Sequence, residues 1–373
     1  EGSVSASQPV QLFQSIAQFG SISAFAFNRR RNLIAVAEKC AVPKVFLYSF
    51  PELQLLGSIS EICELEIQTL DFSRDGSKLA ILTGVPDFRV LLWDLEENCH
   101  LCEGSLEAAP PHLVKVNPVN DRQLISVSTS FVHFWNVESL LDSHELSKRE
   151  AEVFDFGGGR LSFECACWAS PTEAYVGCAD GQLLLFDSAS EEGTVVDIDS
   201  HGGYTITSIV CTIHHVITSC EDGFVRFFER EAHALIREVA ISEDIATSHL
   251  VLLNDFSGLV VLSKNGSIVH LPLPDAYGED HGAELVASGE AQPPSTLMSF
   301  HHGPIRSIAC LPDERPIVFT AGEDKRVLAY DYANNRIEAE FLLDESLTCV
   351  AVSDRLLEPG AAEAAAAAAA VSG

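Results

Sequence analysis

The segment TSCEDGFVRFFE, residues 218–229, contains the pattern that decides the fold. Asp222 and Gly223 stand between two runs of apolar residues, and Phe228 follows Asp222 by six residues, with Glu229 next. An Asp-Gly pair favours a tight hairpin, because Gly tolerates a positive φ and Asp bonds its own backbone. Alternating apolar runs are typical of strands with one buried face. The segment is therefore predicted to form a β-hairpin.

The same pattern recurs along the chain. It appears in TGVPDFRVLLWD (83–94), GCADGQLLLFD (177–187) and TAGEDKRVLAYD (320–331). In each of the four segments a turn Asp precedes an aromatic residue by six positions: Asp87 and Trp93, Asp180 and Phe186, Asp222 and Phe228, Asp324 and Tyr330. Three weaker copies place Tyr48, Trp135 and Leu271 at the aromatic position. The chain therefore contains seven copies of one unit.

The spacing of these units predicts the fold class. Neighbouring aromatic positions in the series 48, 93, 135, 186, 228, 271 and 330 differ by 45, 42, 51, 42, 43 and 59 residues. Most steps match the period of about 40–45 residues that is typical of a four-stranded WD-type propeller blade. The two long steps coincide with residues 140–160 and 274–295, which we interpret as inserted loops. The prediction is an all-β, seven-bladed WD-type propeller.

Two units also contain an upstream His that we pair with the turn Asp. His201 lies 21 residues before Asp222, and His302 lies 22 before Asp324. This resembles the His-to-Asp hydrogen bond that ties a WD blade together. A Thr and the aromatic residue of the same unit are expected to complete each network, Thr218 with Phe228 and Thr320 with Tyr330. The alternative, catalysis or metal binding, is disfavoured because a unique active site does not repeat at blade spacing.

Four segments are expected along the chain. Residues 1–19 are a flanking strand segment, 20–345 the seven-bladed propeller as one domain, 346–358 an extra strand segment, and 359–373 an Ala-rich low-complexity tail. The flanking segments allow two interpretations. Either a terminal strand completes a blade begun at the other end, or the chain is one propeller of a larger protein. The absence of an initiating Met and the abrupt Ala-rich end favour the second interpretation.

Composition indicates a soluble protein in a reducing compartment. Hydrophobic residues make up 47% of the chain, yet no run reaches the roughly 18 apolar residues of a membrane span, and residues 1–11 lack the features of a signal peptide. Most of the eleven cysteines lie in strand patterns, where a thiol behaves as a small apolar group. Cys99 and Cys102 form a lone CxxC without a second pair. We therefore expect no metal, no cofactor and no catalytic residues.

The net charge of −31 restricts the partners. An acidic surface repels phosphates, so neither nucleic acid nor an anionic membrane is an expected partner. The microtubule lattice is acidic too, so attachment there is expected through basic partner subunits or through a local basic patch. The densest basic cluster is Arg29, Arg30 and Arg31. Its alternative interpretation is a solvated loop between two strands of the first unit, so direct contact with tubulin is left open.

The first four units carry a more specific resemblance. NLIAVAEKCAVPKVFLYSFPEL (32–53), GVPDFRVLLWD (84–94), VNPVNDRQL (116–124) and CWASPTEAYVGCADGQLLLFD (167–187) resemble the WD-repeat proteins of motile cilia and flagella. Within that group the chain looks closest to the tether and tether-head subunits of the two-headed inner dynein arm. The resemblance implies a second propeller and a coiled-coil tail in the full-length protein. It also implies an axonemal location, with another WD-repeat subunit, a dynein heavy chain and doublet-associated proteins as partners.

The function that follows is a non-catalytic scaffold that positions inner-arm dynein motor domains on the doublet microtubule. The alternative is a WD-repeat adaptor that reads peptide motifs, of the ubiquitin-ligase or vesicle-coat type, which a basic ring at the channel mouth would favour. An enzyme is disfavoured, because no G-x-S-x-G, Walker or His-Glu zinc pattern occurs in the sequence.

Overall fold

The computed structural model describes most of the repeat region. The described residues are 21–106, 111–140, 143–153, 161–190, 192–197, 199–241, 246–253, 258–273, 293–298, 301–302, 305–310, 317–331, 336–343, 345–347 and 350. They form seven antiparallel sheets, which we number blades 1 to 7 in chain order. None of the described segments forms an apolar helix long enough to cross a membrane. The all-β, seven-bladed prediction is confirmed.

Each blade takes its four main strands from one continuous stretch of chain. Blade 1 contains β1 (Ser21–Asn28), β2 (Leu33–Lys39), β3 (Val45–Ser49) and β4 (Leu55–Ile59). Blade 2 contains β5 (Ile67–Phe72), β6 (Lys78–Thr83), β7 (Arg89–Asp94) and β8 (Cys99–Ser105). Blade 3 contains β9 (Pro111–Val116), β10 (Gln123–Ser128), β11 (Val132–Ser139) and β12 (His144–Glu150). Blade 4 contains β13 (Glu152–Val153), β14 (Phe163–Trp168), β15 (Glu173–Cys178), β16 (Leu183–Asp187) and β17 (Glu192–Asp197). Blade 5 contains β18 (Ile206–Cys211), β19 (His215–Cys220), β20 (Phe224–Glu229) and β21 (Leu235–Ala240). Blade 6 contains β22 (Thr247–Leu252), β23 (Gly258–Ser263), β24 (Ile268–Pro272) and β25 (Ser295–Met298). Blade 7 contains β26 (Ile305–Cys310), β27 (Ile317–Gly322), β28 (Arg326–Asp331) and β29 (Arg336–Leu342).

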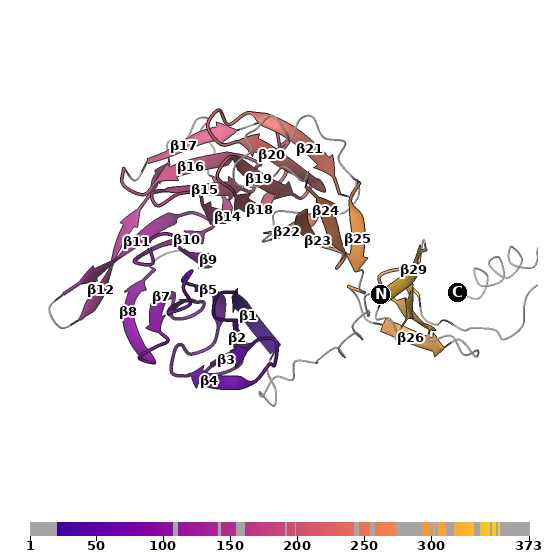
Figure 1. Ribbon diagram of the computed structural model, residues 1–373, viewed down its shortest axis with the longest axis horizontal. Helices are drawn as coiled ribbons and strands as arrows, with labels where there is room; N and C mark the ends of the chain where they lie inside the picture. The colour runs from indigo at the N-terminus through magenta and orange to yellow at the C-terminus, as the bar shows by residue number, and fades with distance from the viewer. Residues whose placement is uncertain are drawn as a thin grey trace, which may run out of the picture. The chain divides into compact units, whose positions relative to one another are not determined.

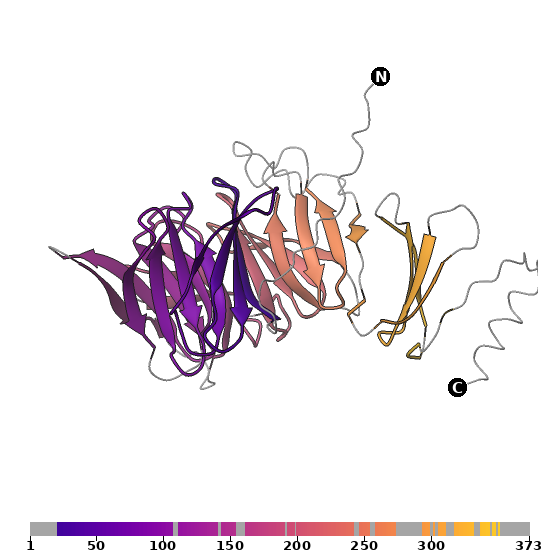
Figure 2. The ribbon, with the colours of Figure 1, turned by 90° about the horizontal axis from the view of Figure 1, so that it is seen from below.

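The chain divides into two compact units. The larger comprises residues 11–264 and 270–295, and the smaller comprises residues 1–10, 265–269 and 296–373. Within the larger unit the first strands of successive blades contact one another and face a common centre (Figure 1). The sheets of this unit stand beside one another when the molecule is turned (Figure 2). The assignment of residues 20–345 to a single domain stays a prediction.

The hydrophobic core lies between successive blades. One cluster joins blades 1 and 2 through residues such as Ala35 and Ile81, and further clusters join blades 2 to 3, 3 to 4 and 4 to 5. Adjacent residues of β11 serve different clusters, because Trp135 packs against blade 2 and Phe134 against blade 4. Successive side chains of a strand point to opposite faces, so a sheet covered on both faces needs apolar residues throughout. This explains why the central strands are continuously apolar in sequence, as in LAIL at 79–82.

A β-bulge recurs at the same place in every blade. One residue of the first strand is skipped in its pairing with the second strand, namely Ser23, Gln68, His112, Glu164, Thr207, Ser248 and Arg306. A bulge bends a strand and increases its local twist. The seven units therefore repeat in backbone geometry as well as in sequence.

The structure corrects the interpretation of residues 140–160 as a loop. Residues 144–150 form β12, the fourth strand of blade 3, and residues 152–153 form β13, which pairs in parallel with β17 of blade 4. Only Leu146 of β12 is buried, so the strand lacks the alternating apolar pattern by which strands were recognised.

Several other sequence expectations fall on residues outside the described ranges. These are the flanking segment 1–19, the Ala-rich tail 359–373 and residues 274–292 of the second expected insertion. Of the expected strand segment 346–358, only Ser346, Leu347 and Val350 are described, and none of the three lies in a strand.

Candidate functional site

The four turn Asp residues occupy equivalent places in their blades. Each lies in the turn that joins the second strand of a blade to the third: Asp87 between β6 and β7, Asp180 between β15 and β16, Asp222 between β19 and β20, and Asp324 between β27 and β28. Three of the carboxylates accept a bond from the backbone N two residues later, such as that from Gln182 to Asp180 Oδ1 at 3.2 Å. Asp87 instead accepts from the backbone N of Glu64 at 2.9 Å.

The residues that set the spacing all lie on third strands. They are Tyr48 on β3, Trp93 on β7, Trp135 on β11, Phe186 on β16, Phe228 on β20, Leu271 on β24 and Tyr330 on β28. In blades 1, 2, 5 and 7 the pairing of the third strand with the fourth shifts register immediately before this residue. Counting from the aromatic position therefore located the third strand in every blade.

Blade 7 contains a His–Asp–Thr network, but the His is His301. Its Nδ1 lies 2.9 Å from Asp324 Oδ1, and its Nε2 lies 2.8 Å from Thr320 Oγ1. The predicted His302 also lies near this carboxylate, with Nδ1 3.5 Å from Asp324 Oδ2, but it is His301 that joins Asp324 to Thr320. The His302 ring is 46% exposed, and its backbone N–H donates to Asp324 Oδ2 at 3.1 Å. Sequence spacing could not choose between two adjacent His residues, because both reach the same carboxylate.

Blade 5 has a related network with a different acid. His201 is fully buried, stacks on Phe228, and places Nε2 2.9 Å from Thr218 Oγ1. Its Nδ1 lies 3.2 Å from an oxygen of Asp197, not from Asp222. Burial alone would raise the pKa of Asp197, but hydrogen bonds from His201 and Ser200 lower it. The predicted pairing of His201 with Asp222 is therefore wrong, although His201 and Thr218 are in contact.

Asp222 is bound instead by an Arg that the sequence analysis missed. Arg226 on β20 places Nη2 2.6 Å from Asp222 Oδ2 and Nε 2.7 Å from a carboxylate oxygen of Glu238 on β21. Its side chain is only 6% exposed. Third-strand arginines also pair with fourth-strand acids in two other blades, Arg89 with Glu103 and Arg326 with Glu340, although these two arginines lie two residues nearer the turn than Arg226 does. A single Arg inside an apolar third strand was the signal available in the sequence.

These networks hold blades together and offer no reaction centre. His201 is fully buried, and the His301 and Asp324 side chains are 5% and 1% exposed. A substrate has no access to groups buried to that extent. Their bonds join the segment before a blade's first strand to its central hairpin, so they fix the geometry of the blade.

The expected basic cluster lies in the turn between β1 and β2. Arg31 bridges to blade 2, because its Nε donates to the backbone O of Asp75 at 2.8 Å and its Nη2 pairs with Glu96. Arg30 is exposed, and Arg29 lines a cavity that the other two residues do not line. The three arginines therefore have three different environments.

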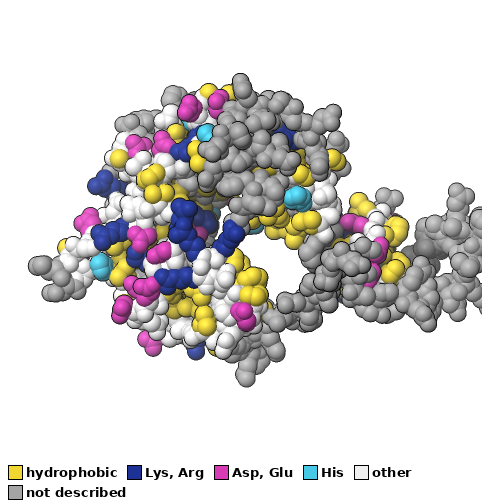
Figure 3. Space-filling view, in the orientation of Figure 1, with side chains coloured by type: hydrophobic (Ala, Val, Ile, Leu, Met, Phe, Trp, Pro, Cys, Tyr) yellow, Lys and Arg dark blue, Asp and Glu magenta, His cyan; other side chains and the backbone are white. Residues whose placement is uncertain are grey.

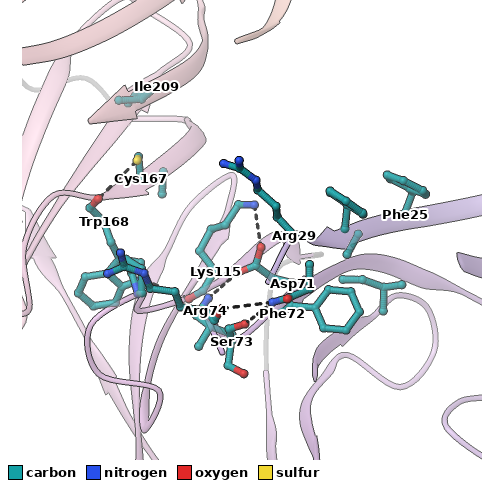
Figure 4. A pocket seen from close by; sticks show the side chains of 17 residues that line it. Phe25, Arg29, Asp71, Phe72, Ser73, Arg74, Lys115, Cys167, Trp168 and Ile209 are labelled. Atoms are coloured by element: carbon teal, nitrogen blue, oxygen red, sulfur yellow. Dashed lines mark hydrogen bonds and ion pairs between the residues drawn. The ribbon is translucent and has the colours of Figure 1, made fainter. Parts of the chain in front are cut away.

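That cavity lies on the inner strands of the larger unit. Its volume is about 540 Å³, and it is lined by residues of β1, β5, β9, β14 and β18 and of the turns that follow the first three of these strands. Arg29 directly follows β1, and Arg74 is the second residue after β5; both line the cavity (Figure 4). We call this cavity the channel pocket.

The channel pocket is basic, in contrast to the chain as a whole. Arg29, Arg74 and Lys115 line it, together with one acidic residue, Asp71. Lys115 Nζ lies 3.0 Å from Asp71 Oδ1, and this carboxylate raises the pKa of Lys115. Among the described residues, no carboxylate pairs with Arg29 or Arg74. Figure 3 shows Lys and Arg side chains gathered at the middle of this face.

Two cysteines adjoin the channel pocket. Cys167 on β14 lines it, and Cys211 lies on the neighbouring strand β18. The pKa of Cys167 is lowered because the Cys211 thiol hydrogen-bonds to it and because the Lys115 ammonium lies nearby, against the opposing effect of burial. The pKa of Cys211 is raised by the same hydrogen bond. The pKa values of the two thiols therefore shift in opposite directions.

This arrangement predicts a reactive thiol. Brief treatment with iodoacetamide near neutral pH is expected to alkylate Cys167 at least about tenfold faster than Cys165, because the thiolate is the nucleophile. Cys165 lies two residues away on the same strand, but it is buried and its pKa is raised by that burial. Peptide mass spectrometry measures both rates, with exposed Cys99 as the reference. Equal rates for Cys165 and Cys167 would contradict this assignment.

The lone CxxC does not form a ligand cluster in the described part of the chain. Cys99 is exposed and Cys102 is buried, both on β8. Among the described residues, no group of three or more His, Cys, Asp and Glu side chains is arranged to hold a metal ion.

Fold and blade chemistry define the chain as a WD-type β-propeller protein. It belongs to the CFAP43 N-terminal domain family, whose profile matches residues 17–276. It is 24% identical over 351 residues to mouse cilia- and flagella-associated protein 44, covering 87% of this chain and 18% of that protein. It is 21% identical over 303 residues to mouse cilia- and flagella-associated protein 43, covering 67% and 18%. The resemblance to ciliary and flagellar WD-repeat proteins is therefore confirmed, and the chain spans less than a fifth of these relatives' length.

A solved structure supports the fold. The β-propeller domain of Cps50 (Swd1) from Myceliophteria thermophila matches with a TM-score of 0.60 and 13% identity. The match covers 86% of this chain and 99% of that domain. At this identity the likeness concerns architecture alone.

Proposed function

We propose that this chain is a non-catalytic scaffold of the motile cilium or flagellum, located in the axoneme. The observation that carries the proposal is the CFAP43 N-terminal domain match over residues 17–276, which covers blades 1 to 5 and the first three strands of blade 6. The relatives that support an axonemal location are named cilia- and flagella-associated proteins.

The architecture suits the positioning of several partners at fixed distances. Within the larger unit, buried apolar clusters fix blades 1 to 4 against one another, and the turns of these blades present separate surfaces to solvent. The proposed partners are another axonemal WD-repeat subunit, a dynein heavy chain and doublet-associated proteins. We propose the tether and tether-head complex of the two-headed inner dynein arm as the assembly in which this chain holds motor domains.

Proximity labelling tests this proposal. A biotin ligase fused to the protein in motile ciliated cells is expected to label a dynein heavy chain and axonemal WD-repeat proteins. Loss of the protein is expected to alter motor placement and beat waveform, while the ATPase activity of the isolated dynein stays unchanged. The ligase alone, directed to the cilium, is the control for neighbours labelled by chance. Labelling dominated by nuclear, vesicular or ubiquitin-ligase proteins, without a dynein heavy chain, would refute the proposal.

One observation favours a second candidate, a WD-repeat adaptor that reads peptide motifs. The basic residues of the channel pocket occupy the part of the propeller where such an adaptor would hold its peptide. The same labelling experiment separates the two candidates, because an adaptor of the ubiquitin-ligase or vesicle-coat type would label those machineries.

A further inference from the structure

We infer that the channel pocket is a binding site for an acidic peptide segment of a protein partner. The inference concerns the chemistry of one cavity, and it holds for a scaffold and for an adaptor alike. It rests on the placement of Arg29, Arg74 and Lys115 around one cavity of the larger unit.

The first step is the convergence of the basic residues. Arg29 follows β1, Arg74 follows β5, and Lys115 lies near the end of β9, so three successive blades each supply one cation. Arg29 and Arg74 stand at the same position of their blades, two residues beyond Phe27 and Phe72. Equivalent positions of neighbouring blades lie side by side around the centre, which brings residues distant in sequence to one rim.

The second step is the availability of the charges. Lys115 is neutralised by Asp71 in the same layer of inner strands. Arg29 and Arg74 are exposed, and no described carboxylate pairs with either. Guanidinium groups donate paired hydrogen bonds to carboxylates, and such charge-assisted bonds are stronger than neutral ones. The two arginines are therefore available to bind carboxylates of a ligand.

The third step is the contrast with the rest of the chain. The channel pocket has three basic residues and one acidic residue, whereas the whole chain has 23 basic and 54 acidic residues. A local positive potential on a chain of net charge −31 attracts an anion that is small enough to enter the cavity. It does not attract a long polyanion or a charged sheet that must also cover the surroundings.

Size and shape favour a peptide. A cavity of about 540 Å³ lies within the range of roughly 300–1,000 Å³ that is usual for ligand pockets. It accommodates a few residues of an extended chain. The net charge of −31 on the whole chain disfavours nucleic acid and anionic membrane, so glutamate and aspartate side chains are the carboxylates that fit both the charge and the space.

The test uses a fluorescein-labelled oligoglutamate peptide and the purified chain. Fluorescence anisotropy is expected to show saturable binding that weakens as salt is added, because exposed charges are screened. The double variant Arg29→Ala with Arg74→Ala is expected to weaken binding by about tenfold or more. Asp71→Asn is expected to strengthen binding, since it removes the one negative charge of the pocket and keeps an oxygen that accepts from the backbone N of Val116.

The matched control is Arg30→Ala. Arg30 is adjacent to Arg29 in the same turn, is exposed and does not line the pocket, so its loss should leave the affinity unchanged. Thermal midpoints equal to that of the unsubstituted chain show that each variant is folded. Equal peptide affinity of the double variant and the Arg30→Ala variant would overturn the inference.

Other ligands provide the remaining outcomes. A charge-matched oligolysine peptide is expected not to bind. Binding of inositol hexakisphosphate, single-stranded DNA or anionic lipid vesicles without binding of oligoglutamate would also overturn the inference. These results are independent of cellular location, so failure here does not affect the axonemal proposal, and failure of the labelling experiment does not affect the pocket.

Discussion

Replacing Asp324 with Ala is expected to destabilise blade 7 by about 1–3 kcal/mol. The carboxylate is 1% exposed and accepts hydrogen bonds from the His301 ring and from the backbone N–H groups of His302 and Arg326. Its removal leaves the His301 ring, which is 5% exposed, without its acceptor and removes the acceptor of two backbone N–H groups. Thermal unfolding measures the effect, and hydrogen exchange of β27 and β28 shows whether the loss is confined to blade 7.

Asp180→Ala is the matched control for this substitution. Asp180 occupies the equivalent turn of blade 4, but among the described residues it accepts hydrogen bonds only from the backbone and side chain of Gln182. Asp180→Ala should lower the free energy of unfolding much less than Asp324→Ala does. Asp255, which lies outside the repeat pattern, falls outside the described residues and is the less informative comparison. Equal shifts in midpoint for the Asp324 and Asp180 variants would show that the His301 network adds nothing to stability.

The same network sets a pH dependence. Burial by itself raises the pKa of Asp324, but hydrogen bonds from His301 and from the backbone of His302 outweigh burial and lower it below the ordinary value of 3.8. A carboxyl group whose pKa is lowered by folding stabilises the native state above its unfolded pKa, and this contribution is lost as the pH falls through the folded pKa. The unsubstituted chain should therefore exceed Asp324→Asn in free energy of unfolding by a constant amount above about pH 5, and this difference should decrease as the pH falls below 3.8.

Replacing Gly104 with Ala is expected to destabilise the interface of blades 2 and 3 by about 1–3 kcal/mol. A Cβ at Gly104, on the outer strand β8, would overlap the indole ring of Trp135. That ring is 1% exposed and fixed by the hydrogen bond from its Nε1 to Ser126 Oγ at 2.8 Å, so it cannot move aside without breaking a buried contact. A lower midpoint with reduced protection of Trp135 in fluorescence quenching is the expected result.

Gly57→Ala is the control for Gly104→Ala. Gly57 lies on β4, the outer strand of blade 1, and a Cβ there would meet no atom within 4 Å. Its substitution should leave stability unchanged or raise it slightly, since Ala restricts the unfolded chain more than Gly does. An equal loss of stability in both variants would show that replacing Gly in an outer strand is itself destabilising and that overlap with Trp135 is not the cause.

The sequence predicted the architecture well because the blade repeats its strongest signals at fixed positions. Asp87 and Asp222 lie in the same turn of different blades, and Trp93 and Phe228 lie on the same strand of those blades. These signals are local, since a turn and its following strand are specified within a dozen residues. The strand β12 escaped detection because its rim position requires only one buried side chain, that of Leu146.

The partners of the networks and the channel pocket could not be predicted from the sequence. His201 pairs with Asp197, four residues earlier in the sequence, whereas the repeat spacing predicts Asp222 as its partner, and Asp222 binds Arg226 instead. The pocket depends on the ring arrangement of first strands, which brings Arg29 and Arg74 to one rim. Local sequence carries no record of which residues meet across blades. The repeat pattern therefore predicts strands and turns better than it predicts which side chains come together in a network or pocket.

The short strand β13 determines where a partner can add a strand to blade 4. The outermost strand of a sheet leaves unpaired N–H and C=O groups, to which an extended segment of another protein can hydrogen-bond. In blade 4 that place is occupied, because Glu152 and Val153 pair in parallel with Glu192 and Gly193 of β17. The segment that leaves blade 3 thus acts as a built-in competitor for strand addition along this part of β17. A binding protein that docks by extending a sheet must therefore displace this segment or choose another blade.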